Sequence, residues 1–156
     1  MRKIFVFIAI FFASNFCPVY ALELPDNINE WHSLKEFITP LIPAANNKYI
    51  GRIMHKYYSR NNPRGDLEII LTEGTGAGEL YIPESVRDSG ELFNTSSGYE
   101  IINVSGYSAI LEKHENLPLA LAVKINNNTT LTIETHALNE SELIKFAGDL
   151  LSNSIK

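Results

Sequence analysis

The chain has 156 residues, among them 18 aspartate and glutamate residues against 13 lysine and arginine residues, which gives a formal net charge of −5 at pH 7. This excess of negative charge argues against general binding to nucleic acid or to anionic membranes, because both need a positive surface. The single cysteine, Cys17, excludes an intrachain disulfide, so a hydrophobic core has to stabilise the fold without one.

Residues 1–21 have the pattern of a secretory signal peptide. Arg2 and Lys3 form a positive start, residues 4–13 are apolar, and Val19-Tyr20-Ala21 is a small-residue exit. The apolar stretch is shorter than the about 20 residues that a transmembrane helix needs. The pattern therefore predicts an exported protein.

Cleavage after Ala21 would leave residues 22–156 as a single domain, periplasmic or secreted, with no cysteine and no transmembrane segment. A lipoprotein anchored through Cys17 is not expected. Lipoprotein processing prefers a small residue at the position before the cysteine, and Phe16 stands there.

The first segment after the signal peptide is predicted to hold a short amphipathic helix. Its apolar side chains recur at helical spacing at Trp31, Leu34, Phe37 and Ile38. The helix would end before Pro40, because the residue before a proline disfavours helical geometry. Trp31 would either pack this helix onto the domain or anchor a partner, since tryptophan is common in both settings.

Residues 48–60 fit a helix and a strand almost equally well, and we favour the strand. Residues 61–66 form a dense turn signal of asparagine, proline and glycine, and residues 67–72 form a clear strand. The two strands would make a hairpin.

A basic residue recurs every four residues along this hairpin, with no acidic residue between, at Lys48, Arg52, Lys56, Arg60 and Arg64. In a strand, residues two or four apart share one face. The pattern predicts a positive patch, formed by Arg52, Lys56, Tyr58 and Arg60. Such a patch would bind an acidic protein or another anionic surface. The alternative is a solvated edge strand, whose basic residues discourage aggregation.

The middle of the chain is predicted to be loop and then strand. The glycine-rich residues 74–78 match neither a dinucleotide-binding nor a phosphate-binding motif. Residues 79–98 are predicted to be mostly loop with a short helical piece. Residues 99–112 fit one strand with a bulge or bend at Ser105-Gly106.

The following stretch alternates apolar and polar residues on both sides of Asn126-Asn127-Asn128. This alternation is typical of strands, and the asparagines favour a turn. A turn centred on the middle asparagine would place Val123 opposite Leu131 and Leu121 opposite Ile133. Both strands would then turn their apolar residues to the same face, which supports this register.

Asn139 and Glu142 have the spacing of a capping box, which predicts that a helix begins here. The helix has an apolar face at Leu143, Phe146, Ala147, Leu150 and Leu151. We therefore expect an α+β fold, in which an antiparallel β-sheet is covered by this C-terminal helix and by the short N-terminal helix.

The order of elements in the last third of the chain resembles the tail of the PsbP-like α/β/α sandwiches. The resemblance rests on the motif Val104-Ser105-Gly106-Tyr107-Ser108-Ala109, the two short strands after it, and the helix that begins with residues 140–147. It implies a central antiparallel sheet between helical layers and an accessory or binding role. No site residue carries over, because no site motif matches.

The sequence shows no catalytic constellation. It lacks a Gly-x-Ser-x-Gly nucleophile motif, and no close histidine pair suggests a zinc site among His32, His55, His114 and His136. We therefore expect a non-enzymatic accessory protein without cofactor or metal, which binds a protein or an anionic surface. The alternatives are a carrier with an apolar groove between sheet and helix, and a hydrolase without recognisable motifs.

Overall fold

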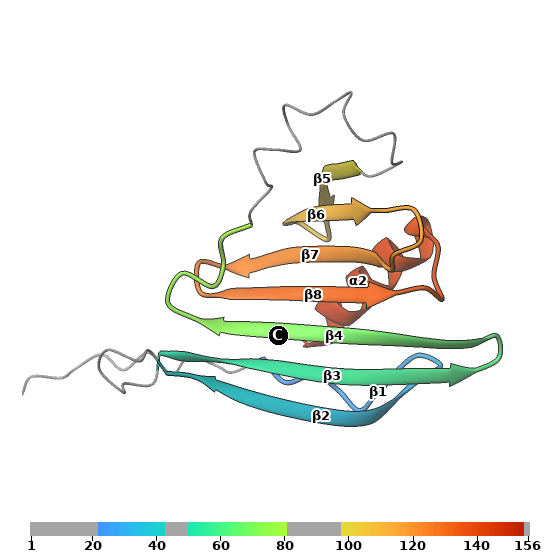
Figure 1. Cartoon of the computed structure of the whole chain (residues 1–156), viewed down its shortest axis with the longest axis horizontal. Coiled ribbons are helices and arrows are strands. Elements are labelled where there is room, and N and C mark those ends of the chain that lie inside the picture. The colour runs from blue at the N-terminus through green and yellow to red at the C-terminus, as the bar shows by residue number, and fades with distance from the viewer. Residues whose placement is uncertain (1–21, 43–49, 81–97, 155–156) are drawn as a thin grey trace, which may run out of the picture.

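The structure, a computed structural model, describes residues 22–42, 50–80 and 98–154 (Figure 1). Within these residues, eight strands form one antiparallel sheet in the order β1-β2-β3-β4-β8-β7-β6-β5. The elements are β1 (Asn27–Ile28), β2 (Trp31–Leu41), β3 (Gly51–Asn61), β4 (Arg64–Gly74), β5 (Gly98–Val104), β6 (Tyr107–Lys113), β7 (Leu119–Asn126), β8 (Thr129–Thr135) and α2 (Glu140–Ser154).

The predicted signal peptide, Cys17 and most of the predicted loop at residues 79–98 lie outside the described residues. In the part of the chain that is described, no helix has the length and apolar character needed to cross a membrane.

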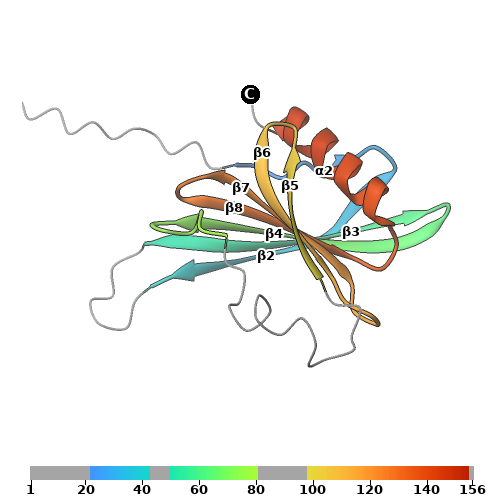
Figure 2. The ribbon, with the colours of Figure 1, turned by 90° about the horizontal axis from the view of Figure 1, so that it is seen from above.

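Two antiparallel meanders make up the sheet, the first from β1 to β4 and the second from β5 to β8. They join where β4 pairs with β8, with Ile69 opposite Ile133 and Leu71 opposite Leu131. All four of these side chains are fully buried. The centre of the sheet is therefore also the centre of the core, and the strands fan out from it with a strong twist (Figure 2).

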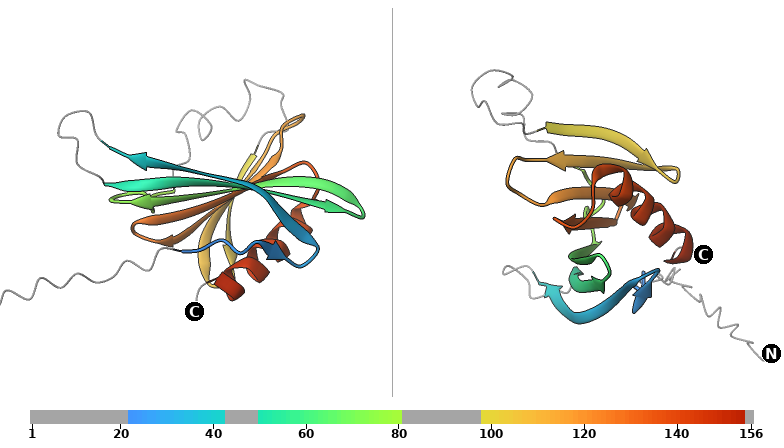
Figure 3. Two further views of the ribbon diagram at one scale, coloured as in Figure 1. Left: turned by 90° about the horizontal axis from the view of Figure 1, so that it is seen from below. Right: turned by 90° about the vertical axis from the view of Figure 1, so that its right-hand side faces the viewer.

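One face of the sheet, called here the inner face, is covered by two elements. Helix α2 and the extended segment Leu22–Asn29 both lie on this side (Figures 2 and 3). We call this segment the N-terminal strap. Trp31, at the start of β2, contacts Phe146 of α2 edge to face, with ring centroids 6.0 Å apart. Buried leucine and isoleucine side chains fill the space between sheet and helix.

The predicted α+β class, with an antiparallel sheet and a C-terminal helix, is confirmed. Residues 51–60 of the predicted strand over residues 48–60 and residues 67–72 do fall in a strand hairpin, β3 and β4, while residues 48 and 49 lie outside the described residues. The register of the last hairpin is also as predicted, with Val123 opposite Leu131 and Leu121 opposite Ile133. The described helix, α2, lies on one face of the sheet (Figures 2 and 3), and the PsbP-like resemblance stays a prediction.

The predicted start of the C-terminal helix is confirmed as well. The backbone N–H of Glu142 donates to the Asn139 side chain at 3.1 Å, and the Glu142 carboxylate accepts from the backbone N–H of Asn139 at 2.9 Å. The five residues of the predicted apolar face are buried. This reciprocal cap satisfies backbone donors that the first turn of a helix otherwise leaves unpaired.

The predicted N-terminal helix is wrong, because its residues form β2, which lies at the edge of the sheet beyond its two-residue pairing with β1. Leu34, Phe37 and Ile38 are between 45% and 67% exposed, and the pairing with β3 shifts register between Ser33 and Lys35. An edge strand with a bulge does not need the strict alternation of a half-buried strand. The apolar residues were therefore free to fall at helix-like intervals.

The predicted single strand over residues 99–112 is also wrong. It is two strands, β5 and β6, joined by a tight turn in which Ser105 and Gly106 both have positive φ, 52° and 92°. Two consecutive residues with positive φ are typical of a two-residue hairpin turn, which reverses the chain rather than bending it.

Replacing Asn139 by alanine tests the cap of α2. Asn139→Ala removes the acceptor for the Glu142 N–H and is expected to lower the free energy of unfolding by about 1 kcal/mol. Asn139→Asp keeps an acceptor in place and should be nearly neutral. Urea unfolding of the three proteins measures the difference, and equal losses in both variants would contradict the role of the cap.

Candidate functional site

The residues of the predicted positive patch share one face of β3, but this is the inner face, and the N-terminal strap covers it. Lys56 is 5% exposed, Arg60 is 9% exposed and Tyr58 is fully buried. Tyr58 donates its hydroxyl proton to the carbonyl of Pro25 in the strap at 2.7 Å. Burial, together with nearby carboxylates, raises the pKa of Tyr58 well above its ordinary value.

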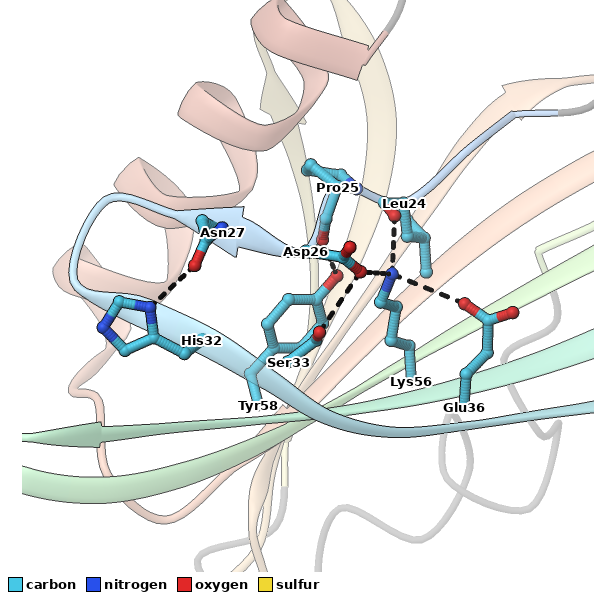
Figure 4. Close-up of polar contacts among 9 residues, drawn as sticks. All are labelled: Leu24, Pro25, Asp26, Asn27, His32, Ser33, Glu36, Lys56 and Tyr58. Atoms are coloured by element: carbon cyan, nitrogen blue, oxygen red, sulfur yellow. Dashed lines mark hydrogen bonds and ion pairs between the residues drawn. The ribbon is translucent and has the colours of Figure 1, made fainter.

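The ammonium of Lys56 lies at the centre of this contact (Figure 4). Its Nζ donates to the Leu24 carbonyl and to Asp26 Oδ1, both at 2.8 Å, and lies 3.4 Å from Glu36 Oε2. The hydrogen bond from Lys56 and the charge of Lys56 lower the pKa of Asp26. The three protons of one buried cation therefore face three acceptors, two in the strap and one on β2.

The two arginines are paired in the same way. Arg52 Nε lies 2.5 Å from Glu73 Oε2, and Arg60 Nη1 lies 2.5 Å from Glu30 Oε1. The Arg60 guanidinium also lies over the Trp31 ring, 4.7 Å from its centroid. The expectation of an accessible positive patch is therefore wrong, because carboxylates from other segments neutralise these cations and the strap covers them. Three of the five basic residues, Arg52, Lys56 and Arg60, share the inner face of β3, whereas Arg64 is exposed at the start of β4.

The opposite, outer face of the sheet shows a different chemistry. The pairing registers align one residue from each of six strands, β3, β4, β8, β7, β6 and β5, in a continuous row. We call it the outer row, and its members in that order are Tyr57, Glu68, Glu134, Ala120, Glu112 and Tyr99. Directly opposite residues have Cβ atoms about 4.5–5.5 Å apart, so Glu68 and Glu134 are close neighbours.

Towards each end of the outer row, a histidine side chain contacts a glutamate carboxylate. His55 Nδ1 lies 2.6 Å from Glu68 Oε1, and His114 Nε2 hydrogen bonds to Glu112. Tyr99 donates its hydroxyl proton to Glu112 at 3.0 Å. Each outer glutamate thus has a histidine beside it, and the pKa of Tyr99 is raised by burial and by that hydrogen bond.

Glu134, in the middle of the outer row, is in a different position. Burial raises its pKa above the ordinary value, and the negative charges of Glu68 and Glu112 raise it further, against a smaller opposite effect from His55. A carboxylate between two others is stabilised by an incoming positive charge. The row is therefore an electrostatic site that favours cations.

A groove of about 930 Å³ opens beside the outer row, within the size range of ligand sites. Its lining combines apolar, aromatic, acidic and basic side chains, among them Phe37, Tyr57, Glu68, Glu134, Lys35 and Arg64. The ammonium of Lys35 lies over the Phe37 ring, 4.0 Å from its centroid. Phe37 and Tyr57 meet edge to face, with ring centroids 6.2 Å apart. Apolar and aromatic side chains of the groove therefore lie next to the carboxylates of Glu68 and Glu134.

In the described ranges, no group of three histidine, cysteine, aspartate or glutamate side chains is arranged to hold a metal ion. The carboxylates of the outer row come from strands that are spread across the sheet rather than converging on one point. The row therefore spreads its negative charge along a line across the sheet rather than around one point.

No local pattern in the sequence singles out the outer row. Its residues are far apart in the chain, and only the strand pairing aligns them. One signal was present, because the correctly predicted register of Leu121 with Ile133 also places Ala120 opposite Glu134. Glu68 and Glu112 could not be added without the pairing of β4 with β8 and of β6 with β7.

No family model, curated protein or solved structure matches this chain. Its function has to be inferred from the geometry of its own residues.

Reversing the charge of Lys56 tests whether the basic residues of the predicted positive patch stabilise the fold. Lys56→Glu places a carboxylate among three acceptors and is expected to lower the free energy of unfolding by about 3–5 kcal/mol. Arg64→Glu makes the same change in the same repeat at an exposed position and should cost less than about 0.5 kcal/mol. Urea unfolding would contradict the buried pairing if both variants were equally stable.

The pH dependence of stability tests the environment of Glu134. A carboxyl group whose pKa is raised by folding contributes stability below its unfolded pKa, near 4.3, and that contribution is lost as the pH rises through the folded pKa. Glu134→Gln should therefore raise the melting temperature at pH 7 by about 1–3 °C, a small shift because water screens a partly exposed group. The gain should disappear below about pH 4.

Glu115→Gln is the matched control, because Glu115 is exposed in the turn between β6 and β7. It should leave the melting temperature unchanged at both pH values. A Glu134→Gln variant that is less stable than the original protein at pH 7 would contradict the repulsion within the outer row.

Proposed function

We propose that the protein is an exported, non-enzymatic binding protein that holds a positively charged segment of a partner protein against the outer face of its sheet. The observation that supports this best is the alignment of Glu68, Glu134 and Glu112 in one row, with the pKa of Glu134 raised by its two neighbours. A lysine or arginine side chain placed there would remove this repulsion.

The groove beside the row supports a protein segment rather than a free cation. Lysine and arginine have long apolar stems that pack on apolar and aromatic surfaces while the charged head stays at a polar site. Phe37 and Tyr57 form such a surface next to Glu68, and Lys35 of the chain itself already lies over the Phe37 ring at 4.0 Å, so a partner's side chain would have to displace it or bind beside it. Cations also bind favourably over aromatic rings.

The charge balance of the whole chain fits the same proposal. The formal net charge is −5, and residues 1–21 include two of the basic residues. Arg52, Lys56 and Arg60 are occupied by internal pairing on the inner face. The proposal of an anionic partner, which relied on these three residues, therefore loses its support, and a cationic partner gains it.

A defined peptide tests this function. The probe is a decapeptide of alternating lysine and leucine, with a peptide of alternating glutamate and leucine as its counterpart, measured by isothermal titration calorimetry at low salt. We expect the lysine peptide to bind and the glutamate peptide not to bind. The double variant Glu68→Gln/Glu134→Gln should weaken binding about tenfold, which corresponds to about 1.4 kcal/mol.

The matched control is Glu23→Gln/Glu115→Gln, which changes the net charge by the same amount at two exposed positions outside the row. It should change the dissociation constant less than about twofold, because distant exposed charges are screened. Equal weakening by both double variants would mean that only the overall charge matters, and the outer row would then not be the site.

A hydrolase is the second candidate, supported by the pairing of Glu134, whose pKa is raised, with Glu68 on the adjacent strand. Retaining glycosidases use an acid and a nucleophilic carboxylate about 5–5.5 Å apart. Turnover of aryl glycosides that Glu134→Gln abolishes would favour this candidate over a binding protein. A carrier has less support, because buried side chains fill the space between sheet and helix.

A further inference from the structure

The N-terminal strap begins at a buried carboxylate. The backbone nitrogen of Leu22 donates a hydrogen bond to Glu73 Oε1 at 3.0 Å. Glu73 is only 7% exposed, and its other oxygen, Oε2, lies 2.5 Å from Arg52 Nε. The two oxygens of one carboxylate thus hold the first residue of the strap and the first basic residue of β3.

The rest of the strap follows β3 from this point. Leu24 and Asp26 accept hydrogen bonds from the Lys56 ammonium. The Pro25 carbonyl accepts one from the Tyr58 hydroxyl. The strap is therefore fixed by a series of contacts along one strand, and the contact of Leu22 with Glu73 is the first of them. An acceptor that is nearly buried and that faces a backbone nitrogen is suited to a stronger donor than an amide.

The predicted cleavage of the signal peptide supplies that donor. Hydrolysis of the bond between Ala21 and Leu22 consumes one water molecule, gives Ala21 a carboxyl group and converts the Leu22 amide nitrogen into an amine. At neutral pH this amine takes up a proton and becomes an ammonium group. The same nitrogen then has three protons and a positive charge in place of one proton and none.

We propose that Glu73 is the binding site for the N-terminus that signal-peptide cleavage creates, and that cleavage completes an ion cluster of the Leu22 ammonium, Glu73 and Arg52 that locks the strap onto β3. The proposal rests on cleavage after Ala21 and is independent of what the outer face binds. Cleavage at this bond thus stabilises the folded protein as well as removing a leader.

The first test is the position of the cleavage. The full chain is produced in a secreting host, and the mature protein is analysed by N-terminal sequencing and intact mass. Leu22 as the first residue supports the proposal. A different first residue would overturn it, because the ammonium would then not lie at Glu73.

The second test compares two proteins that differ in where the amine lies. One comprises residues 22–156, which include every described element, and the other comprises residues 21–156, in which Ala21 moves the amine one residue away from Glu73. At pH 6 the protein that begins at Leu22 should melt about 2–4 °C higher, because a charge-assisted hydrogen bond to a nearly buried carboxylate is stronger than a neutral one.

The pH dependence separates an ion pair from a simple effect of chain length. The pKa of a free α-amino group is about 7.7–8.0, and pairing with a carboxylate raises it. The added stability is therefore present below that range and is lost as the pH rises through the higher pKa of the paired amine. The difference between the two proteins should be largest at pH 6 and should vanish near pH 10.

Equal melting temperatures at pH 6, or a difference that persists at pH 10, would overturn the proposal. A further readout is Glu73→Gln in both proteins, which should abolish the difference between them. Should this variant fail to fold because Arg52 loses its partner, the pH series on the unmodified side chains still decides the question.

Discussion

The buried ammonium of Lys56 is the constraint on which the N-terminal half of the molecule depends. A cation without partners inside a protein costs several kcal/mol, so its acceptors must be present whenever the protein is folded. They come from Leu24 and Asp26 in the strap and from Glu36 on β2. The strap and β2 are also held by the pairing of β2 with β3, by the buried side chains of Ile28 and Trp31, and by the hydrogen bond of Tyr58 to Pro25. The Lys56 side chain of β3 thus contacts both the N-terminal strap and β2.

The two faces of the sheet divide the charges of the chain between them. On the inner face, Arg52, Lys56 and Arg60 are each matched by a carboxylate, which leaves little net charge there. On the outer face, Glu68 and Glu112 of the outer row are hydrogen bonded to histidines, and the nearest strand register beyond the row places Lys35 opposite Tyr57. Alternation along a strand makes this separation possible, because adjacent residues point to opposite sides. The acidic character of the chain is thereby concentrated where no element of the described structure covers it.

The sequence predicts those parts of the fold that local patterns control. The register of Val123 with Leu131 follows from alternation on both sides of a short turn, and the cap at Asn139 follows from four consecutive residues. The strand β2 could not be predicted in this way, because Leu34, Phe37 and Ile38 are exposed and keep no period of two. The burial of Lys56 could not be predicted from the local sequence either, since its acceptors lie 20 to 32 residues earlier in the chain. The alignment of the outer row needs the long-range pairing of β4 with β8, which no local pattern encodes.

The position of β8 has a consequence for the timing of folding. It is the last strand in the chain, yet it lies in the middle of the sheet, between β4 and β7, and α2 follows it. Before β8 exists, the two meanders are separate and have no helix to cover them, and pairings between distant segments form slowly. Synthesis must therefore pass Thr135 before a complete hydrophobic core can assemble. Any machinery that needs an extended chain can engage it until that strand has been made.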